Sequence, residues 1–136
     1  MQIKVKKKQT DNKVVYKQLS YRIVGSLFDV FNELDYGYQE KHYCKAIEKA
    51  FTEKEIKFKK QVPFKIKFKK EEIGRYFLDF LIEDKIILEI KKGNYFIKRN
   101  INQVNGYLKA TGLKLAILAN FTSDGIKFMR LLNIEK

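Results

Sequence analysis

The chain has 136 residues, of which 45% are hydrophobic, so it can bury one sizeable core but leaves little room for two domains. Lys and Arg number 29 against 16 Asp and Glu, a formal net charge of +13, which favours a polyanionic partner such as nucleic acid; a Lys-rich genomic composition would give the same excess. A single cysteine, Cys44, and a single histidine, His42, exclude an internal disulfide and a zinc site built on several such ligands, and we expect Cys44 in the core and His42 on a helix surface.

The chain begins with a Lys-rich polar segment, and we expect a basic N-terminal arm over 1–16 followed by a single domain over 17–136. No apolar segment lies behind the first basic residues, which argues against a secretory signal. No apolar run approaches the roughly 18–20 residues that a membrane helix needs. We therefore expect a cytoplasmic protein with no membrane partner.

Two helices are predicted first. From Leu19 to Leu34, apolar residues recur at helical spacing, and Gly37 follows where a left-handed C-terminal cap is usual. A second helix is predicted over 38–55. Glu40 lies in its first turn, where a carboxylate meets the positive end of the helix dipole.

The hydrophobic period then changes to two. Residues 62–68 alternate apolar and basic side chains, which predicts a half-exposed strand, and Pro63 suggests an edge position. The lysines of this region interleave with phenylalanines. They could bind phosphate, or they could form the solvated side of an amphipathic strand, and the sequence leaves both interpretations open. A turn is predicted at 71–74.

The remaining elements complete a mixed architecture. Strands are predicted at 76–82 and 86–91, a third helix at 97–110 ended by Gly112, and strands at 113–119 and 126–132. The order α-α-β-β-β-α-β-β predicts an α/β (α+β) domain in which helices pack on a mixed sheet.

Three charged residues stand inside predicted strands that are otherwise almost wholly apolar: Asp79, Glu89 and Lys91. Buried strands rarely tolerate charge unless it is paired or binds a metal. Because side chains alternate along a strand, Glu89 and Lys91 point to the same face.

The position of Asp79 depends on the loop between the two strands. A three-residue loop over 83–85 pairs Ile82 with Ile86, which sets Asp79 opposite Glu89; a loop of even length would put Asp79 on the other face. Two carboxylates supply the hard oxygen ligands that Mg²⁺ prefers, and a nearby ammonium can assist hydrolysis of a phosphodiester. A trio of charges that merely neutralise one another is the alternative.

Asp79 followed by Glu89, Ile90 and Lys91 resembles the D…(D/E)-x-K signature of the PD-(D/E)XK phosphodiesterase superfamily. The proline of the superfamily name is absent, since Leu78 precedes the first acid. Residues 37–43 read as the G-x-x-E-x-x-Y motif that names a family of small proteins within this superfamily. Residues 103–107 match a Q-x-x-x-Y helix motif of exonuclease-like members, and residues 107–113 with the following LAILANF resemble the C-terminal half of the family.

This resemblance implies a restriction-endonuclease-like fold and a role for each matching residue. Asp79 and Glu89 are the implied metal ligands, with the Ile90 carbonyl as a third oxygen, and Lys91 is the implied catalytic lysine. Glu40 is implied to complete the metal site; a carboxylate that only meets the helix dipole is the alternative. The implied cofactor is Mg²⁺, for which Mn²⁺ can substitute.

The resemblance also places Gln103 and Tyr107 beside the site, one helical turn apart; the alternative is an exposed Gln and a Tyr at the edge of the core. Gly37 and Tyr43 are expected to be structural. We expect Lys92, Lys98 and Arg99 to bind nucleic acid, with DNA favoured over RNA. Superfamily members commonly work as dimers or higher assemblies, and a homodimer is the assembly considered for this chain. The predicted function is a Mg²⁺-dependent nuclease; the alternatives are a non-catalytic nucleic-acid-binding module on the same fold and a structural or interaction protein.

Overall fold

The computed structural model describes residues 14–133, so most of the basic arm expected over 1–16 lies outside the described residues. Five strands form one sheet in the order β1-β2-β3-β4-β5. Only β3 and β4 run parallel, and α4 connects them, as a parallel pair requires. The element order confirms the predicted one. The elements are α2 (Lys17–Leu34), α3 (Glu40–Glu53), β1 (Phe58–Phe68), β2 (Glu71–Ile82), β3 (Ile86–Lys92), α4 (Lys98–Thr111), β4 (Leu115–Thr122) and β5 (Gly125–Leu132).

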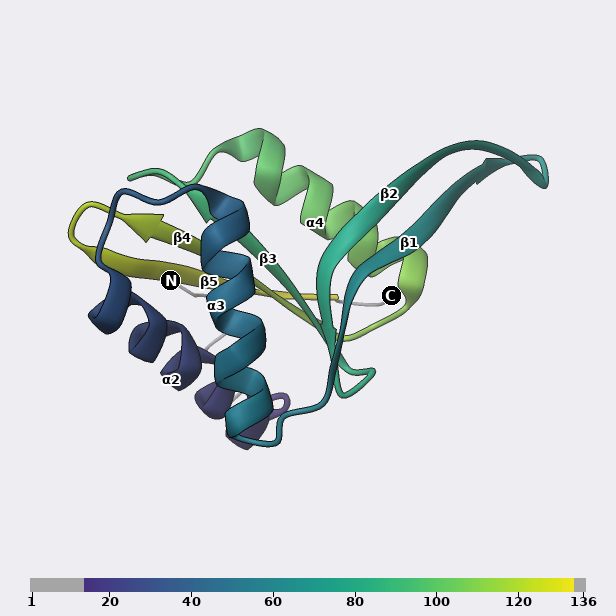
Figure 1. Ribbon diagram of the computed structural model, residues 1–136. Helices are drawn as coiled ribbons and strands as arrows, with labels where there is room; N and C mark the ends of the chain where they lie inside the picture. Colours follow the sequence, from purple (N-terminus) through teal and green to yellow (C-terminus); the bar gives the residue numbers. More distant parts are fainter. Residues whose placement is uncertain (1–13, 134–136) are drawn as a thin grey trace.

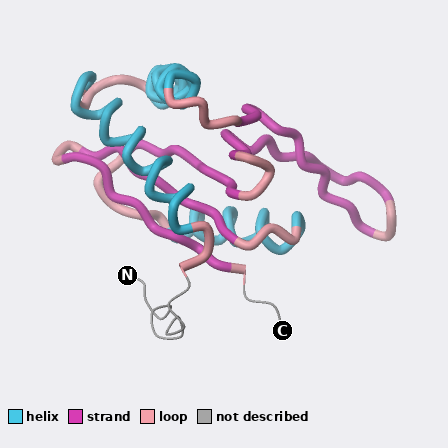
Figure 2. The backbone as a smooth tube through the Cα atoms, turned by 90° about the horizontal axis from the view of Figure 1, so that it is seen from below, coloured by secondary structure: helices cyan, strands magenta, loops and turns pink. Residues whose placement is uncertain are grey.

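Helices cover both faces of the sheet, with α2 and α3 on one side and α4 on the other (Figures 1 and 2). The larger core lies between the sheet and α2 and α3, and it is built from residues such as Leu27, Phe51 and Leu88. The smaller core lies under α4, around Val104 and Leu108. Because both faces are covered, β3 and β4 are almost continuously apolar, as expected for buried parallel strands. None of the described helices combines the length and the apolar content that a membrane crossing demands.

The turn between α2 and α3 is held by the first and last residues of the G-x-x-E-x-x-Y segment. Gly37 has a φ of 121°, which favours glycine. Tyr43 is fully buried and its ring stacks on Phe121 at 4.1 Å between centroids. Its hydroxyl donates a 2.6 Å hydrogen bond to the carbonyl of Asp35. The expectation that Gly37 and Tyr43 are structural is therefore confirmed.

The turn predicted at 71–74 is wrong, because these residues belong to β2 and pair with β1. The chain reverses instead at Lys69 and Lys70, whose φ angles of 51° and 72° are left-handed. Two residues of positive φ match the twist of a tight hairpin. Gly74 lies opposite Ile66, whose side chain approaches the space that a Cβ would occupy to 3.5 Å. This is an ordinary contact distance, so Gly74 is a paired residue of β2 and takes no part in chain reversal.

β1 and β2 form a long hairpin whose outer part extends beyond the rest of the sheet (Figure 1). We call Val62–Leu78 of this hairpin the arm. Near the sheet, Phe58 and Phe80 pack against the larger core, whereas in the arm Val62 and Leu78 pack against the core under α4. The even-numbered side chains of the hairpin therefore face the larger core near the sheet and α4 in the arm, and the change occurs at Gln61. The Gln61 backbone is left-handed (φ 49°), and the regular pairing of β1 with β2 is interrupted there. β1 is an edge strand, as Pro63 suggested.

Candidate functional site

The two acidic residues of the central strands meet where β2 separates from β3. Ile82 pairs with Ile86, as the three-residue loop predicted, and the antiparallel ladder continues to Phe80 and Leu88. It ends there, one pair before Asp79 and Glu89. The register predicted for the hairpin is confirmed, but the two acids lie just past the last ladder pair and not inside the ladder.

Each acid replaces a missing ladder bond by binding the backbone of the opposite strand. The Asp79 amide donates a 2.8 Å hydrogen bond to Oε2 of Glu89. The Ile90 amide donates a 2.9 Å hydrogen bond to Oδ2 of Asp79. This reciprocal pair fixes both carboxylates across the gap between β2 and β3 and brings their oxygens together.

Burial makes this pair of carboxylates electrostatically unusual. Glu89 is only 3% exposed. Burial, followed by the neighbouring Asp79 carboxylate, raises the pKa of Glu89 from 4.5 to about 8. Burial also raises the pKa of Asp79, against the opposing effects of the Ile90 hydrogen bond and the Lys91 charge. Two carboxylates this close favour either a shared proton or a bound cation.

Lys91 is half-buried and follows Glu89 by two residues on β3, so its side chain leaves the same face of the strand. Its positive charge lowers the pKa of both carboxyl groups, although burial outweighs it in each. Within residues 14–133, however, Lys91 takes part in no direct ion pair. The alternative of a self-neutralising salt-bridged trio is thus not the arrangement that the structure has.

The Ile90 carbonyl faces the same gap. In a strand, the N–H and the C=O of one residue point to the same neighbour. Because the Ile90 amide points at Asp79, its carbonyl points toward β2 as well, at a level where β2 has left the ladder. An oxygen there is available beside the two carboxylates.

Glu40 is placed near the acid pair without joining it. It is exposed at the start of α3 and lines the same cavity of about 560 Å³ as Asp79, together with Cys44 and Gln61. In the part of the chain that the structure describes, no three His, Cys, Asp or Glu side chains gather closely enough to hold a metal ion. A metal held here would draw on the two acids and on a backbone carbonyl or water.

The α4 side of the site holds Tyr107, which is 3% exposed and packs edge-on against Tyr76 at 5.2 Å. Burial, then the Glu89 carboxylate, raises the pKa of the Tyr107 hydroxyl. Tyr107 is thus near enough for the Glu89 charge to act on its hydroxyl, and its role in the site stays a prediction. Gln103 is half-buried one turn earlier on the same helix.

The basic residues expected to bind nucleic acid lie farther out. Lys92 is exposed, and its ammonium lies 5.1 Å from the centroid of the Tyr36 ring. Lys98 and Arg99 are exposed at the beginning of α4. Among residues 14–133, no hydrogen bond or ion pair connects these three to the acids.

Two residues of the site were not assigned from the sequence. Gln61 lines the cavity with Asp79, and its side chain lowers the pKa of the Asp79 carboxyl. In the sequence, Gln61 stands out only as an uncharged polar residue directly before the alternating residues 62–68. Cys44 packs against the larger core, as expected, but it also lines the cavity; burial, then Asp79, raises its pKa to about 12, so its thiol stays protonated.

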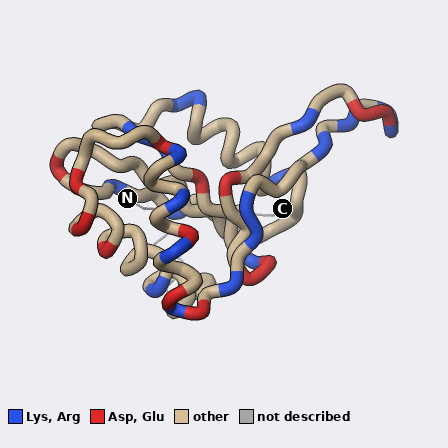
Figure 3. The backbone as a smooth tube through the Cα atoms, viewed as in Figure 1, with Lys and Arg blue, Asp and Glu red and all other residues tan. Residues whose placement is uncertain are grey.

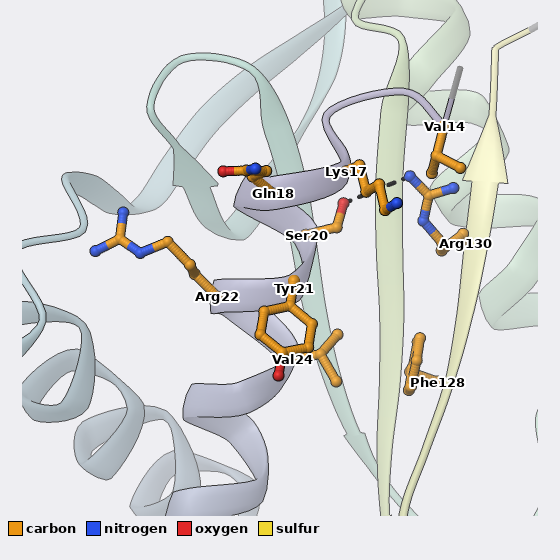
Figure 4. A pocket seen from close by; sticks show the side chains of 9 residues that line it. All are labelled: Val14, Lys17, Gln18, Ser20, Tyr21, Arg22, Val24, Phe128 and Arg130. Atoms are coloured by element: carbon orange, nitrogen blue, oxygen red, sulfur yellow. Dashed lines mark hydrogen bonds between the residues drawn. The ribbon is translucent and has the colours of Figure 1, made fainter. Parts of the chain in front are cut away.

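A second hollow lies between α2 and β5 and contains none of the predicted site residues (Figure 4). Tyr21 and Phe128 line it. Arg130 crosses its end and donates hydrogen bonds to the Val15 carbonyl at 2.5 Å and to Oγ of Ser20 at 3.4 Å. The guanidinium is therefore engaged in holding β5 to the start of α2.

Comparisons with known proteins complete the description of the site. No curated protein matches the chain. A solved structure, titled "Crystal structure of SSO0001", is similar over 88% of this chain and 80% of that one, with 14% sequence identity and a TM-score of 0.46. The five-stranded mixed sheet flanked by helices is consistent with a restriction-endonuclease-like fold. A family model described as "PD-(D/E)XK nuclease superfamily" matches residues 17–130. The chain therefore belongs to the PD-(D/E)XK nuclease superfamily.

Proposed function

We propose that the protein is a cytoplasmic, metal-dependent nuclease that hydrolyses phosphodiester bonds of nucleic acid with Mg²⁺, for which Mn²⁺ can substitute. One observation carries the proposal: Asp79 and Glu89, both largely buried, are held face to face across the gap between β2 and β3. In a chain of the PD-(D/E)XK superfamily, this is the arrangement expected of a divalent-metal site.

The donor set fits a divalent cation. Each carboxylate binds one backbone amide through one oxygen, Oε2 of Glu89 and Oδ2 of Asp79, which leaves its other oxygen without a backbone donor. Burial, and then the neighbouring Asp79 carboxylate, raise the pKa of Glu89, so two negative charges are costly there. A cation would remove this penalty, and the Ile90 carbonyl would add a third hard oxygen.

The proposed roles follow from these positions. Asp79, Glu89 and the Ile90 carbonyl hold the metal, which supplies charge stabilisation for the phosphodiester and a more acidic bound water. The Lys91 ammonium leaves the same face as Glu89, so it is placed to orient the attacking water and to offset phosphate charge. Glu40, from across the cavity, reaches the metal through water.

The outer residues complete the proposal. Tyr107 and Gln103 border the acid pair from α4 and position Lys91 or the phosphate. Lys92, Lys98 and Arg99 contact the substrate backbone, where the last two gain from the N-terminus of α4. Within the superfamily we assign the chain to the GxxExxY group, with DNA favoured as substrate and a homodimer as the assembly, which light scattering can test.

The test is cleavage of labelled single- and double-stranded DNA and RNA by the purified protein with Mg²⁺ or Mn²⁺. We expect cleavage that EDTA abolishes and that Glu89→Gln lowers at least about a hundredfold, because several kcal/mol of metal stabilisation is lost. Glu33→Gln is the matched control, since Glu33 is exposed on α2 and does not line the cavity that holds Asp79. Cleavage that survives both EDTA and Glu89→Gln comes from a contaminant. Salt-sensitive binding without turnover under any metal would instead favour a binding module.

A further inference from the structure

The arm presents two different faces. Phe64 and Tyr76 are directly opposite each other and turn toward α4, where both rings lie edge-on to Tyr107 at 6.4 and 5.2 Å. Because side chains alternate, the neighbouring cross-strand pairs, Pro63 with Phe77 and Lys65 with Arg75, point away from α4. We call this second surface, made of these four residues, the outer face of the arm.

The outer face begins at the acid pair. Phe77 precedes Asp79 by two residues, and Arg75 precedes it by four, so they lie about 7 Å and about 13 Å from it along the strand. On β1, Pro63 lies opposite Phe77 and Lys65 lies opposite Arg75. Outward from Asp79, the outer face therefore presents first an apolar cross-strand pair, Pro63 with Phe77, and then a cationic pair, Lys65 with Arg75. We call these pairs the apolar step and the cationic step.

The cationic step is unfavourable within the protein alone. Lys65 and Arg75 are directly opposite on one face, and like charges in that position destabilise a hairpin. Arg75 is paired with Glu72 at 3.0 Å, whereas Lys65 has no ion pair among the described residues. The arm as a whole holds five basic and two acidic side chains. Lys and Arg mark both of its strands in Figure 3. A phosphate at this step would relieve the repulsion.

The apolar step is exposed. Phe77 leaves 51% of its surface in contact with solvent, and its partner Pro63 is exposed too. An accessible aromatic ring between a metal-ligating acid and a pair of cations is the arrangement on which a nucleic-acid base stacks while its phosphate meets the cations.

We propose that the outer face of the arm binds single-stranded nucleic acid, with a base stacked on Phe77 and a backbone phosphate held by Lys65 and Arg75. The proposal rests on the proposed function, because it takes the acid pair as the point where the bound strand is cut. Phe77 selects a single strand, since the face of a base is available for stacking only when the base is out of a duplex.

The experiment measures binding and not cleavage. All variants are made in the Glu89→Gln background, in EDTA, and fluorescence anisotropy follows a labelled single-stranded oligonucleotide and its duplex over a range of salt. Lys65→Gln with Arg75→Gln is compared with Lys17→Gln with Lys49→Gln, which removes the same charge from exposed positions of α2 and α3. Phe77→Ala is compared with Phe128→Ala, an exposed phenylalanine of β5, the opposite edge strand.

We expect the Lys65 and Arg75 double variant to bind the single strand roughly tenfold more weakly at 0.1 M salt. The slope of log K against log salt should become shallower by about 0.7 for each phosphate that the variant no longer neutralises. Phe77→Ala should weaken single-strand binding by roughly five- to a hundredfold with an unchanged slope. Its effect on the duplex should be smaller, and Phe77→Tyr should restore binding. Losses no larger than those of the matched controls would overturn the proposal, and so would an equal loss on duplex.

The outcome is separable from that of the proposed function. If the arm variants lose single-strand binding but the protein cleaves nothing under any metal, the arm proposal stands and the nuclease proposal fails. If Glu89→Gln abolishes cleavage while the arm variants bind like their controls, the nuclease stands and the arm proposal fails.

Discussion

The metal-free protein should become less stable as the pH rises from about 5 to 8, because of Glu89. Its pKa is 4.5 in the absence of perturbation and about 8 in the folded protein, raised first by burial and then by Asp79. Between these values the folded protein holds a proton that the unfolded chain has released. Proton binding that favours the folded state makes the free energy of unfolding fall as the pH rises through this window.

The magnitude follows from the same two pKa values. One proton retained on folding lowers the free energy of unfolding by about 1.4 kcal/mol per pH unit. Over three pH units the loss reaches at most about 4 kcal/mol, a large share of the 5–15 kcal/mol that stabilises a typical domain. The raised pKa of Asp79 acts in the same direction.

The assay is urea unfolding at four pH values between 5 and 8 in EDTA, for the wild type, Glu89→Gln and the control Glu33→Gln. Glu89→Gln keeps an oxygen to accept the Asp79 amide hydrogen bond but cannot ionise, so it should lose most of the slope and be the more stable protein at pH 8. Mg²⁺ should restore wild-type stability at pH 8, by about 2.7 kcal/mol at a hundred times its Kd. A wild type with flat stability, or a Glu89→Gln curve parallel to it, would refute the reasoning.

Three further substitutions separate the roles of the site residues. Lys91→Met should leave Mn²⁺ affinity by calorimetry within a few fold but lower turnover about a hundredfold; a lost metal site would contradict this role. Gln61→Gly relieves a left-handed backbone but removes a polar side chain that lowers the pKa of Asp79, so thermal stability should hold or rise while Mn²⁺ binds more weakly, and unchanged Mn²⁺ affinity would count against a positioning role. Tyr43→Phe removes the bond to the Asp35 carbonyl and should cost about 1–2 kcal/mol in urea unfolding with turnover per folded molecule unchanged.

The parts of the fold that the sequence predicts well are those set by one dominant period. Helical spacing located α2, and the strand period with a three-residue loop set Ile82 against Ile86. The parity of that loop was enough to bring Asp79 and Glu89 to the same gap. Here local pattern and tertiary packing demand the same arrangement, so the sequence is a sufficient guide.

The parts that the sequence does not predict depend on tertiary contacts. Glutamates and a glycine at 71–74 suggested a turn, yet Gly74 lies within β2, where it pairs with Ile66 of β1. Two lysines reverse the chain, although lysine has little preference for positive φ. The change of face at Gln61 is likewise invisible in the alternating pattern, because each half of the hairpin alternates regularly and only its packing partner differs.

The site and the break in the sheet depend on each other. β2 and β3 share only three ladder pairs, and the next backbone amides, those of Asp79 and Ile90, are bound by the carboxylates of Glu89 and Asp79. The acids therefore satisfy the amides that the separation of the strands exposes, and the separation in turn makes room for a ligand between the acids. Alanine at either position would leave a partly buried amide without its acceptor, which costs about 1–3 kcal/mol. Loss of activity in such a variant would not distinguish chemistry from folding, whereas Glu89→Gln and Asp79→Asn keep the acceptor oxygen and remove only the charge that a metal ion requires.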